Sequence, residues 1–272
     1  MKKILLMLLT VALMCCSLAS CGGGATDYSD LAIVDLGFDR EYFGIAFRSG
    51  SDMTRKVEDI TLDLIKEGKF AEFSEKYEVG AVDENDYVPA ADACEGSGDW
   101  EYIKNKGTLV VGITDYPPMD YRDDNGTWVG FDADYARAVC DALGVVAEFK
   151  EIEWENKLIS LEAKEIDCIW NGMTINEAIE NAADCTVPYM YNTQVAVVKK
   201  VNVDKYKTIE NLAGVSIAAE GGSAGETVIL EDASLKDGLK SVTAQTDAIL
   251  EVMSGASEAA IVDLTLAKAL IK

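Results

Sequence analysis

The side chains able to do chemistry in this chain are carboxylates, aromatic rings, hydroxyls and cysteines, because its 272 residues include no histidine. Without histidine, neither a Ser-His-Asp triad nor a Cys-His pair can form, and most zinc and non-haem iron sites lose a usual ligand. Cys94, Cys140, Cys168 and Cys185 form no C-x-x-C pair, which argues against a metal site. We therefore expect neither a metal nor a cofactor, and the pairing of these thiols stays open.

A glycine-rich turn, "EGGSAG" at 220–225, separates an apolar strand pattern from the start of a helix. Backbone N–H groups at a helix start are free to hold an anion such as a carboxylate. Ser223 and Ala224 are therefore candidate ligand contacts. The spacing matches neither the Walker A loop nor the dinucleotide fingerprint, which disfavours a nucleotide ligand.

The elements that must position these residues alternate regularly from residue 107 onward. Strand patterns at 107–113, 147–152 and 166–172 alternate with helical ones, and a further strand at 193–200 leads into a second block of the same kind. Such alternation predicts an α/β fold with a mostly parallel sheet. Two blocks joined by one extended strand predict two lobes with a cleft between them, where small molecules commonly bind.

The opening part of the chain, before residue 107, does not show this regular alternation of strands and helices. A strand pattern at 43–48 precedes a helix with Met53, Val57 and Leu64 on one face and Gly68 at its C-terminal end. A single strand and helix cannot bury enough apolar surface to be stable alone. An acidic, aperiodic stretch at 79–100 then reads as a surface linker.

The N-terminus predicts export. Lys2 and Lys3 precede a short apolar run, too short for a comfortable membrane span, and small residues follow. "LASC" at 18–21 resembles the bacterial lipobox, which implies a signal peptide at 1–20, a lipidated Cys21 and a tether at 21–26. The alternative is a plain secretory signal. We expect an extracytoplasmic protein, lipid-anchored to the cell membrane at the outer face of the cytoplasmic membrane or in the periplasm.

The formal net charge of −24 argues against nucleic acid as a partner and against charge-driven binding to anionic lipid.

Residues 101–193 resemble the polar amino-acid family (family 3, type 2) of extracytoplasmic solute-binding proteins, which serve ABC importers. The stretches that carry it are "YIKNKGTLVVGITDYPPMDYRDDNGTWVGFDADYARAV", "WENKLISLEAKEIDCIWNGMTI" and "VPYMYNTQVAVVKK". The resemblance continues beyond this block through "TIENLAGVSIAAEGGSAGE" and "AAIVD". The resemblance implies a two-lobed periplasmic-binding-protein-like fold of type 2. It also implies a small polar ligand and an ABC permease as partners.

The opening segment resembles the C-terminal end of the same family, which implies a circularly permuted chain. The expected organisation is lobe 1 from 44–80 plus 107–195, a linker at 81–106, and lobe 2 from 27–41 plus 199–272. We expect a monomer in which the opening segment completes its own molecule. A domain-swapped dimer and a degenerate piece of a tandem duplication remain as alternatives.

The resemblance also implies the ligand site. Asp263, after a strand of the second lobe, matches the partner of the ligand's α-amino group, although a helix N-cap would also explain it. Tyr116 and Trp154 match the rings that stack on the ligand, whereas Trp170 is expected to pack in the core. The complete expected set is Asp115, Tyr116, Trp154, Asn171, Gly172, Met173, Thr174, Glu220, Ser223, Ala224 and Asp263.

One departure from the family concerns the ligand's carboxylate. Ile179 stands where the family has an arginine that clamps that group in a bidentate fork. Since Asp115, Glu220 and Asp263 leave an acidic pocket, the change favours a cationic or amine-bearing ligand, or one without a free carboxylate. Lys199, Arg122 or the helix start at Ser223 are possible substitutes for the arginine.

Three functions follow from these observations. The first is a lipid-anchored receptor that closes around an amino acid or related amine-bearing solute and delivers it to a permease. The second is an enzyme on the same scaffold, a cyclohexadienyl-dehydratase-like lyase, with Glu220 as its acid. The third is a sensory binding protein without a transport role.

Overall fold

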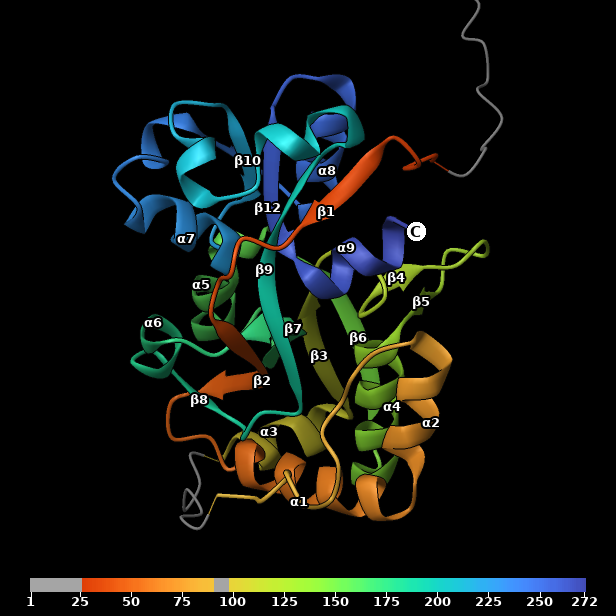
Figure 1. Ribbon diagram of the computed structural model, residues 1–272. Coiled ribbons are helices and arrows are strands. Elements are labelled where there is room, and N and C mark those ends of the chain that lie inside the picture. The colour runs from red at the N-terminus through yellow and green to blue at the C-terminus, as the bar shows by residue number, and fades with distance from the viewer. Residues whose placement is uncertain (1–25, 91–97) are drawn as a thin grey trace, which may run out of the picture.

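The computed structural model describes residues 26–90 and 98–272 (Figure 1). The predicted signal peptide, Cys21 and Cys94 lie outside the described residues. The main sheet has the strand order β11-β10-β12-β9-β2-β7-β3-β6, with β1 paired to β9 and β8 paired to β2, and β4 and β5 form a separate hairpin. Within the described ranges, no helix is long and apolar enough to cross a membrane.

The strands and helices fall into two lobes, joined by the long strand β9, which runs between them in Figure 1. Lobe 1 contains β2 (Arg40–Arg48), α1 (Met53–Lys66), α2 (Lys69–Tyr77), α3 (Asp99–Lys106), β3 (Thr108–Ile113), β4 (Tyr121–Arg122), β5 (Trp128–Val129), α4 (Phe131–Leu143), β6 (Val146–Glu151), α5 (Lys157–Glu162), β7 (Cys168–Thr174), α6 (Glu177–Glu180) and β8 (Ala183–Cys185). Lobe 2 contains β1 (Leu31–Val34), β10 (Ile217–Glu220), α7 (Ala224–Glu231), β11 (Leu239–Val242), α8 (Gln245–Ser254), β12 (Ala259–Asp263) and α9 (Leu264–Leu270). β9 spans Met190–Lys199.

The α/β class and the two lobes are as predicted, but the sheet is mixed rather than mostly parallel. β3 pairs in parallel with β6 and β7, and β10 pairs in parallel with β11 and β12. β1, β2 and β9 make antiparallel pairs. These strands lie where the chain runs from one lobe to the other, from β1 to β2 and along β9. Their direction is therefore set by the connection between the lobes and not by a β/α repeat.

The opening segment, residues 40–77, is built into lobe 1. β2 lies between β9 and β7, and α1 and α2 pack against α4. Phe43, Phe47 and Met53 are fully buried in the core that the segment shares with Trp170. The strand and helix that could not stand alone therefore complete the lobe on which they depend.

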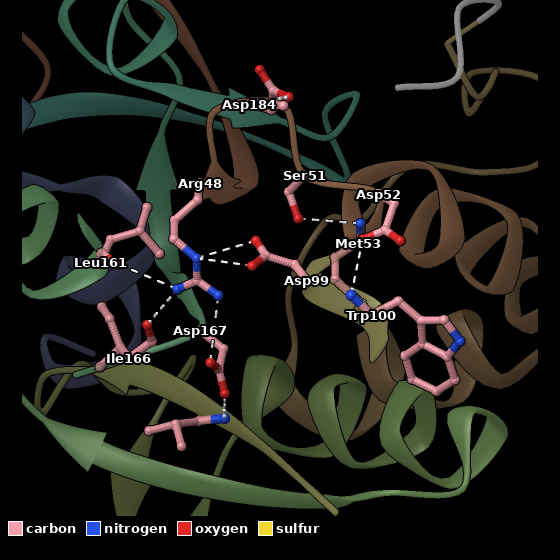
Figure 2. A network of polar contacts seen from close by, with 12 residues as sticks. Arg48, Ser51, Asp52, Met53, Asp99, Trp100, Leu161, Ile166, Asp167 and Asp184 are labelled. Atoms are coloured by element: carbon pink, nitrogen blue, oxygen red, sulfur yellow. Dashed lines mark hydrogen bonds and ion pairs between the residues drawn. The ribbon is translucent and has the colours of Figure 1, made fainter. Parts of the chain in front are cut away.

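A buried ionic network fastens this segment (Figure 2). Arg48, at the end of β2, donates from Nε to both oxygens of Asp99, at 3.1 and 3.2 Å, and from Nη1 to the carbonyl of Ile166 at 2.9 Å. Its Nη2 lies 3.6 Å from Asp167, which Lys106 contacts at 2.5 Å. Asp52 adds a bond from the backbone N–H of Trp100 at 2.9 Å. One arginine thus connects the opening segment with the start of α3 and with the residues just before β7.

The stretch predicted as a surface linker packs in part against lobe 1. Val82 and Tyr87 are buried, and the carboxylate of Glu58 accepts a hydrogen bond from the backbone N–H of Ala90 at 2.9 Å. α3 also begins inside the predicted linker range, at Asp99. Two buried side chains and backbone hydrogen bonds, including one from Val82 to the carbonyl of Tyr189 at 3.0 Å, hold a segment whose overall composition is that of a loop.

The predicted end of the first helix at Gly68 is confirmed, and glycines with positive φ occupy this and other turns. Gly68 adopts φ +80° between α1 and α2, and Gly126 adopts φ +78° in the β4–β5 hairpin. Gly144 ends α4 at φ +73°. Asp132 lies in the first turn of α4, and its carboxylate accepts a hydrogen bond from the backbone N–H of Gly172 at 2.7 Å.

Candidate functional site

A cavity lies between the two lobes. It measures about 20 Å³, which is room for about one water molecule. Its walls come from α5 and β7 of lobe 1 and from β10, α7 and β12 of lobe 2. It is lined by Tyr116, Trp154, Lys157, Asn171, Gly172, Met173, Thr174, Asn176, Ile179, Glu220, Gly222, Ser223, Ala224, Gln245 and Asp263.

Of the residues predicted for the site, all except Asp115 line this cavity. Asp115 follows β3 as expected but its side chain is exposed outside the cavity. Neighbouring Tyr116 is buried and lines the cavity. Sequence reasoning did not find Lys157, Asn176, Gly222 and Gln245.

A larger open groove of about 750 Å³ runs between α2 and α9. Lys76, Tyr191 and Lys268 are among its lining residues. None of the predicted site residues lines it, and the buried carboxylates Glu220 and Asp263 both line the smaller cavity. Convergence of side chains, rather than size, marks the smaller cavity as the candidate site.

Asp263, at the end of β12, is fixed by amide donors. Its Oδ1 accepts from Asn192 and Gln194, and its Oδ2 accepts from Gln245, each at 2.6 Å. It occupies the N-cap position of α9, but its side chain makes no capping hydrogen bond. Burial raises the pKa of Asp263, although the hydrogen bonds from Gln245 and its neighbours oppose the shift. The carboxylate is therefore positioned for a site, and helix capping does not account for it.

Glu41 was missed by sequence reasoning and lies beside this aspartate. Its Oε2 accepts from Gln194 at 2.9 Å and from Asn192 at 3.2 Å, the same amides that bind Asp263. Burial, the larger cause, and repulsion from Asp263 together raise the pKa of Glu41 to about 7. Two carboxylates, one on β2 and one on β12, are thus bridged by two amides of β9 where the chain crosses between lobes.

Glu220, at the end of β10, is buried with only 2% of its surface exposed. Among the described residues, its Oε1 has no hydrogen-bond partner. Burial raises the pKa of Glu220 well above its usual value, repulsion from Asp263 adds to the effect, and Lys157 opposes it. A buried acceptor without a partner is costly, so this oxygen is a candidate contact for a ligand donor.

Lys157, the first residue of α5, brings a buried cation to the same cavity. Its Nζ donates to the carbonyl of Gly222 across the cavity at 2.7 Å and to that of Trp154 at 3.2 Å. Burial lowers the pKa of Lys157 to about 8. The only available signal was its place three residues after Trp154, a predicted ligand contact.

The "WNGMT" stretch, residues 170–174, is the end of β7, and Asn171 to Thr174 line the cavity. The side chain of Asn171 is used inside lobe 1, accepting from the N–H of Thr114 at 2.8 Å and donating to Asp120 at 2.8 Å. Gly172 adopts φ +54°, and a Cβ there would meet the ring of Tyr116 at 2.5 Å. Trp170 is fully buried against Tyr135, the packing role predicted for it.

Some of the backbone N–H groups at the start of α7 already donate hydrogen bonds to side chains of the same helix start. Ser223 Oγ accepts from the N–H of Glu226 at 3.2 Å, and Glu226 Oε2 accepts from the N–H of Gly222 at 2.7 Å. The capacity of this helix start to hold a ligand carboxylate is correspondingly reduced. Ile179 lines the cavity, whereas Lys199 and Arg122, expected as substitutes for an arginine, do not.

Fold and site together define a two-lobed α/β binding protein with a charged cavity at the lobe interface. The family model for bacterial extracellular solute-binding proteins, family 3, matches residues 109–270, and the chain belongs to this family. The two-lobed type 2 fold is therefore confirmed.

Relatives with known functions share only part of the chain. The L-cystine-binding protein TcyJ of Escherichia coli (strain K12) is 34% identical over 122 residues, covering 44% of this chain and 46% of the relative. The ABC transporter arginine-binding protein 1 of the same organism is 32% identical over 114 residues, 42% of this chain and 46% of the relative. The chain thus spans about half the length of the curated relatives it matches.

Solved structures align over a longer range. The arginine-bound form of truncated ArgBP from T. maritima has a TM-score of 0.59 and 34% identity, covering 62% of this chain and 79% of that chain. The ancestral amino acid-binding protein AncCDT-1, a precursor of cyclohexadienyl dehydratase, has a TM-score of 0.59 and 34% identity, with coverages of 62% and 75%.

Proposed function

We propose that this protein captures an amino acid or a related amine-bearing solute between its two lobes and delivers it to an ABC importer. The observation that carries the proposal is the convergence of Asp263 and Glu220 with Tyr116 and Trp154 in the cavity between the lobes. Two carboxylates suit an ammonium through charge-assisted hydrogen bonds, and two rings suit the remainder of a small solute. The cystine-binding and arginine-binding relatives support an amino acid as the ligand class.

Capture requires the lobes to move. A cavity of about 20 Å³ is too small for an amino acid, so the ligand enters an open state and stabilises the closed one. Two passages of chain connect the lobes near the site: β9 and the stretch between β1 and β2. Rotation about two such passages is a hinge motion.

We also propose that the chain is circularly permuted relative to its family and that it is a monomer. The family match begins at residue 109, and the opening segment supplies the strand between β9 and β7. The proposed lobes are 44–80 plus 107–195 and 27–41 plus 199–272, with 81–106 as the linker. Moving residues 27–77 to follow Lys272 tests this: the rearranged chain should fold and bind the same ligands. A domain-swapped dimer would instead appear as twice the mass by light scattering.

The export signal motivates the remaining part of the proposal, an extracytoplasmic protein held to the cell membrane by a lipid on Cys21. Mass spectrometry of the native protein should find a diacylated Cys21 at its N-terminus. An unmodified N-terminus, or cleavage elsewhere, would support a plain secretory signal.

A second candidate function is a cyclohexadienyl-dehydratase-like lyase. The specific observation in its favour is Glu220, a buried carboxyl whose pKa is raised well above its usual value, as a general acid requires. AncCDT-1, an amino acid-binding protein described as a precursor of cyclohexadienyl dehydratase, has a similar structure. Turnover of prephenate or arogenate would support this function, and binding without turnover would favour the receptor.

The receptor is tested by titrating the processed protein with the common L-amino acids in a calorimeter. Saturable binding of one of them, with a raised melting temperature, is the expected result. If no amino acid or amine binds, the receptor function is wrong, and the sensory alternative without a transport role would need a different class of ligand.

A further inference from the structure

Opposite charges face the cavity from opposite lobes. Lys157 belongs to lobe 1 and Glu220 to lobe 2, and both are at least nine-tenths buried. Among the residues lining the cavity, Lys157 is the one cation within the described chain, while Glu220 and Asp263 are the carboxylates. The cavity therefore offers complementary contacts for both charges of a zwitterion.

The ammonium of Lys157 is incompletely compensated. A lysine has three N–H donors, and two of them go to backbone carbonyls, those of Gly222 and Trp154. Within the described residues, it forms no ion pair. Attraction to Glu220 raises the pKa of Lys157, but burial lowers it by more. The ring of Trp154, whose centroid lies 4.9 Å from Nζ, adds a cation–π contact but no negative charge, so this buried cation gains from an anion that arrives beside it.

Glu220 has the reciprocal deficit. Its Oε1 is buried in the cavity without a donor among the described residues, whereas each oxygen of Asp263 already accepts from an amide. A ligand ammonium would give that oxygen the donor it lacks. Asp263 then contributes mainly by its charge and by holding the surrounding amides in place.

We propose that Lys157 binds the carboxylate of the ligand and that Glu220 binds its ammonium, so that the site selects a zwitterionic amino acid even though Ile179 occupies the family's arginine position. This inference rests on the proposed function and deepens it. It replaces the expectation that the loss of arginine favours a ligand without a free carboxylate.

Other cations are poorer candidates for this role. Arg122 is exposed and pairs with Glu151, and neither Arg122 nor Lys199 lines the cavity. At the start of α7, the N–H groups of Gly222 and Glu226 already donate to the side chains of Glu226 and Ser223. Among the cations in the described ranges, Lys157 alone combines burial with a position on the cavity wall.

The test compares each amino acid with its α-carboxamide, which keeps the ammonium and lacks the carboxylate. The probes are L-arginine with L-argininamide, and L-glutamine with L-glutaminamide, titrated into the processed protein. For at least one pair, the wild-type protein should bind the acid about tenfold to hundredfold more tightly than the amide. Lys157→Met should weaken both probes through loss of the contact with Gly222, but it should weaken the acid more and so remove the preference, whereas Lys157→Arg should retain it.

Glu220→Gln should weaken the acid and the amide of a pair alike, since both carry the ammonium. Lys236→Met, an exposed lysine of lobe 2, is the matched control and should change neither affinity. Melting temperatures without ligand verify that each variant is folded.

If Lys157→Met weakens acid and amide equally, or neither, Lys157 does not read the carboxylate and the inference is wrong while the receptor function stands. If the wild-type protein binds the amides as tightly as the acids, the selection of a zwitterion is wrong. If it binds no probe and none of the other amino acids, the proposed function fails as well.

Discussion

Lys157 and Gly222 meet across the interface of the two lobes, with the ammonium of the first donating to the carbonyl of the second at 2.7 Å. The same approach brings Gly222 against the backbone of Glu155, so closely that a Cβ on the glycine would lie 2.8 Å from the Cα of Glu155. Closure of the lobes and completion of the cavity wall therefore depend on the same few residues.

Gly222→Ala is expected to hinder closure. The added methyl would collide with the backbone of Glu155 only when the lobes are together. Amino-acid affinity should fall by about tenfold or more, and small-angle scattering with ligand should show a larger radius of gyration than for the wild type. Gly214→Ala is the matched control, because Gly214 has a similar φ of +73° and open space around it. Equal effects of both substitutions would mean that backbone strain, rather than closure, is responsible.

Arg48→Met should destabilise lobe 1 by about 3 to 5 kcal/mol, because it leaves the buried carboxylate of Asp99 without its cationic partner and that of Asp167 with Lys106 alone. Chemical denaturation measures the loss, and hydrogen exchange should show reduced protection in β2 and α1. Lys150→Gln, which removes an exposed pair with Glu165, should cost less than about 1 kcal/mol. Unchanged protection of the opening segment in Arg48→Met would contradict the anchoring role.

Glu41 should make stability fall as the pH rises. Its pKa is raised from 4.5 to about 7 in the folded protein. Between these values the folded state keeps a proton that the unfolded state has lost, so the contribution of Glu41 is fully present below about pH 4.5 and is lost as the pH approaches 7. Glu41→Gln removes this dependence.

The difference in unfolding free energy between Glu41→Gln and the wild type should therefore grow by about 1 to 3 kcal/mol across that window. Urea denaturation at several pH values measures it. A constant difference would mean that Glu41 ionises at an ordinary pKa in the folded state.

Much of the site could be predicted because it lies at the ends of strands. Glu220 ends β10 and Asp263 ends β12, and these two strands pair in parallel. Parallel strands bring their C-terminal ends to one edge of a sheet. Trp154 and Gly172 were found through the family resemblance, which covers the body of lobe 1.

The residues that escaped prediction depend on contacts between distant parts of the chain. Lys157 matters because its side chain crosses to Gly222 in the other lobe, and periodicity records only the face of a helix. Glu41 lies beside Asp263 because β2 is inserted next to β9, a pairing that its own sequence does not encode. Likewise, alternating patterns do not distinguish a parallel strand from an antiparallel one, which is why the mixed sheet was not foreseen.

The central claim is that buried carboxylates between the lobes hold the amino group of a captured amino acid, and calorimetric titration of the processed protein tests it most directly. The wild-type protein should bind at least one L-amino acid at a single site, and Asp263→Asn and Glu220→Gln should each weaken that binding about tenfold or more. Binding of equal strength in both variants, or no binding of any amino acid to the wild type, would contradict the claim.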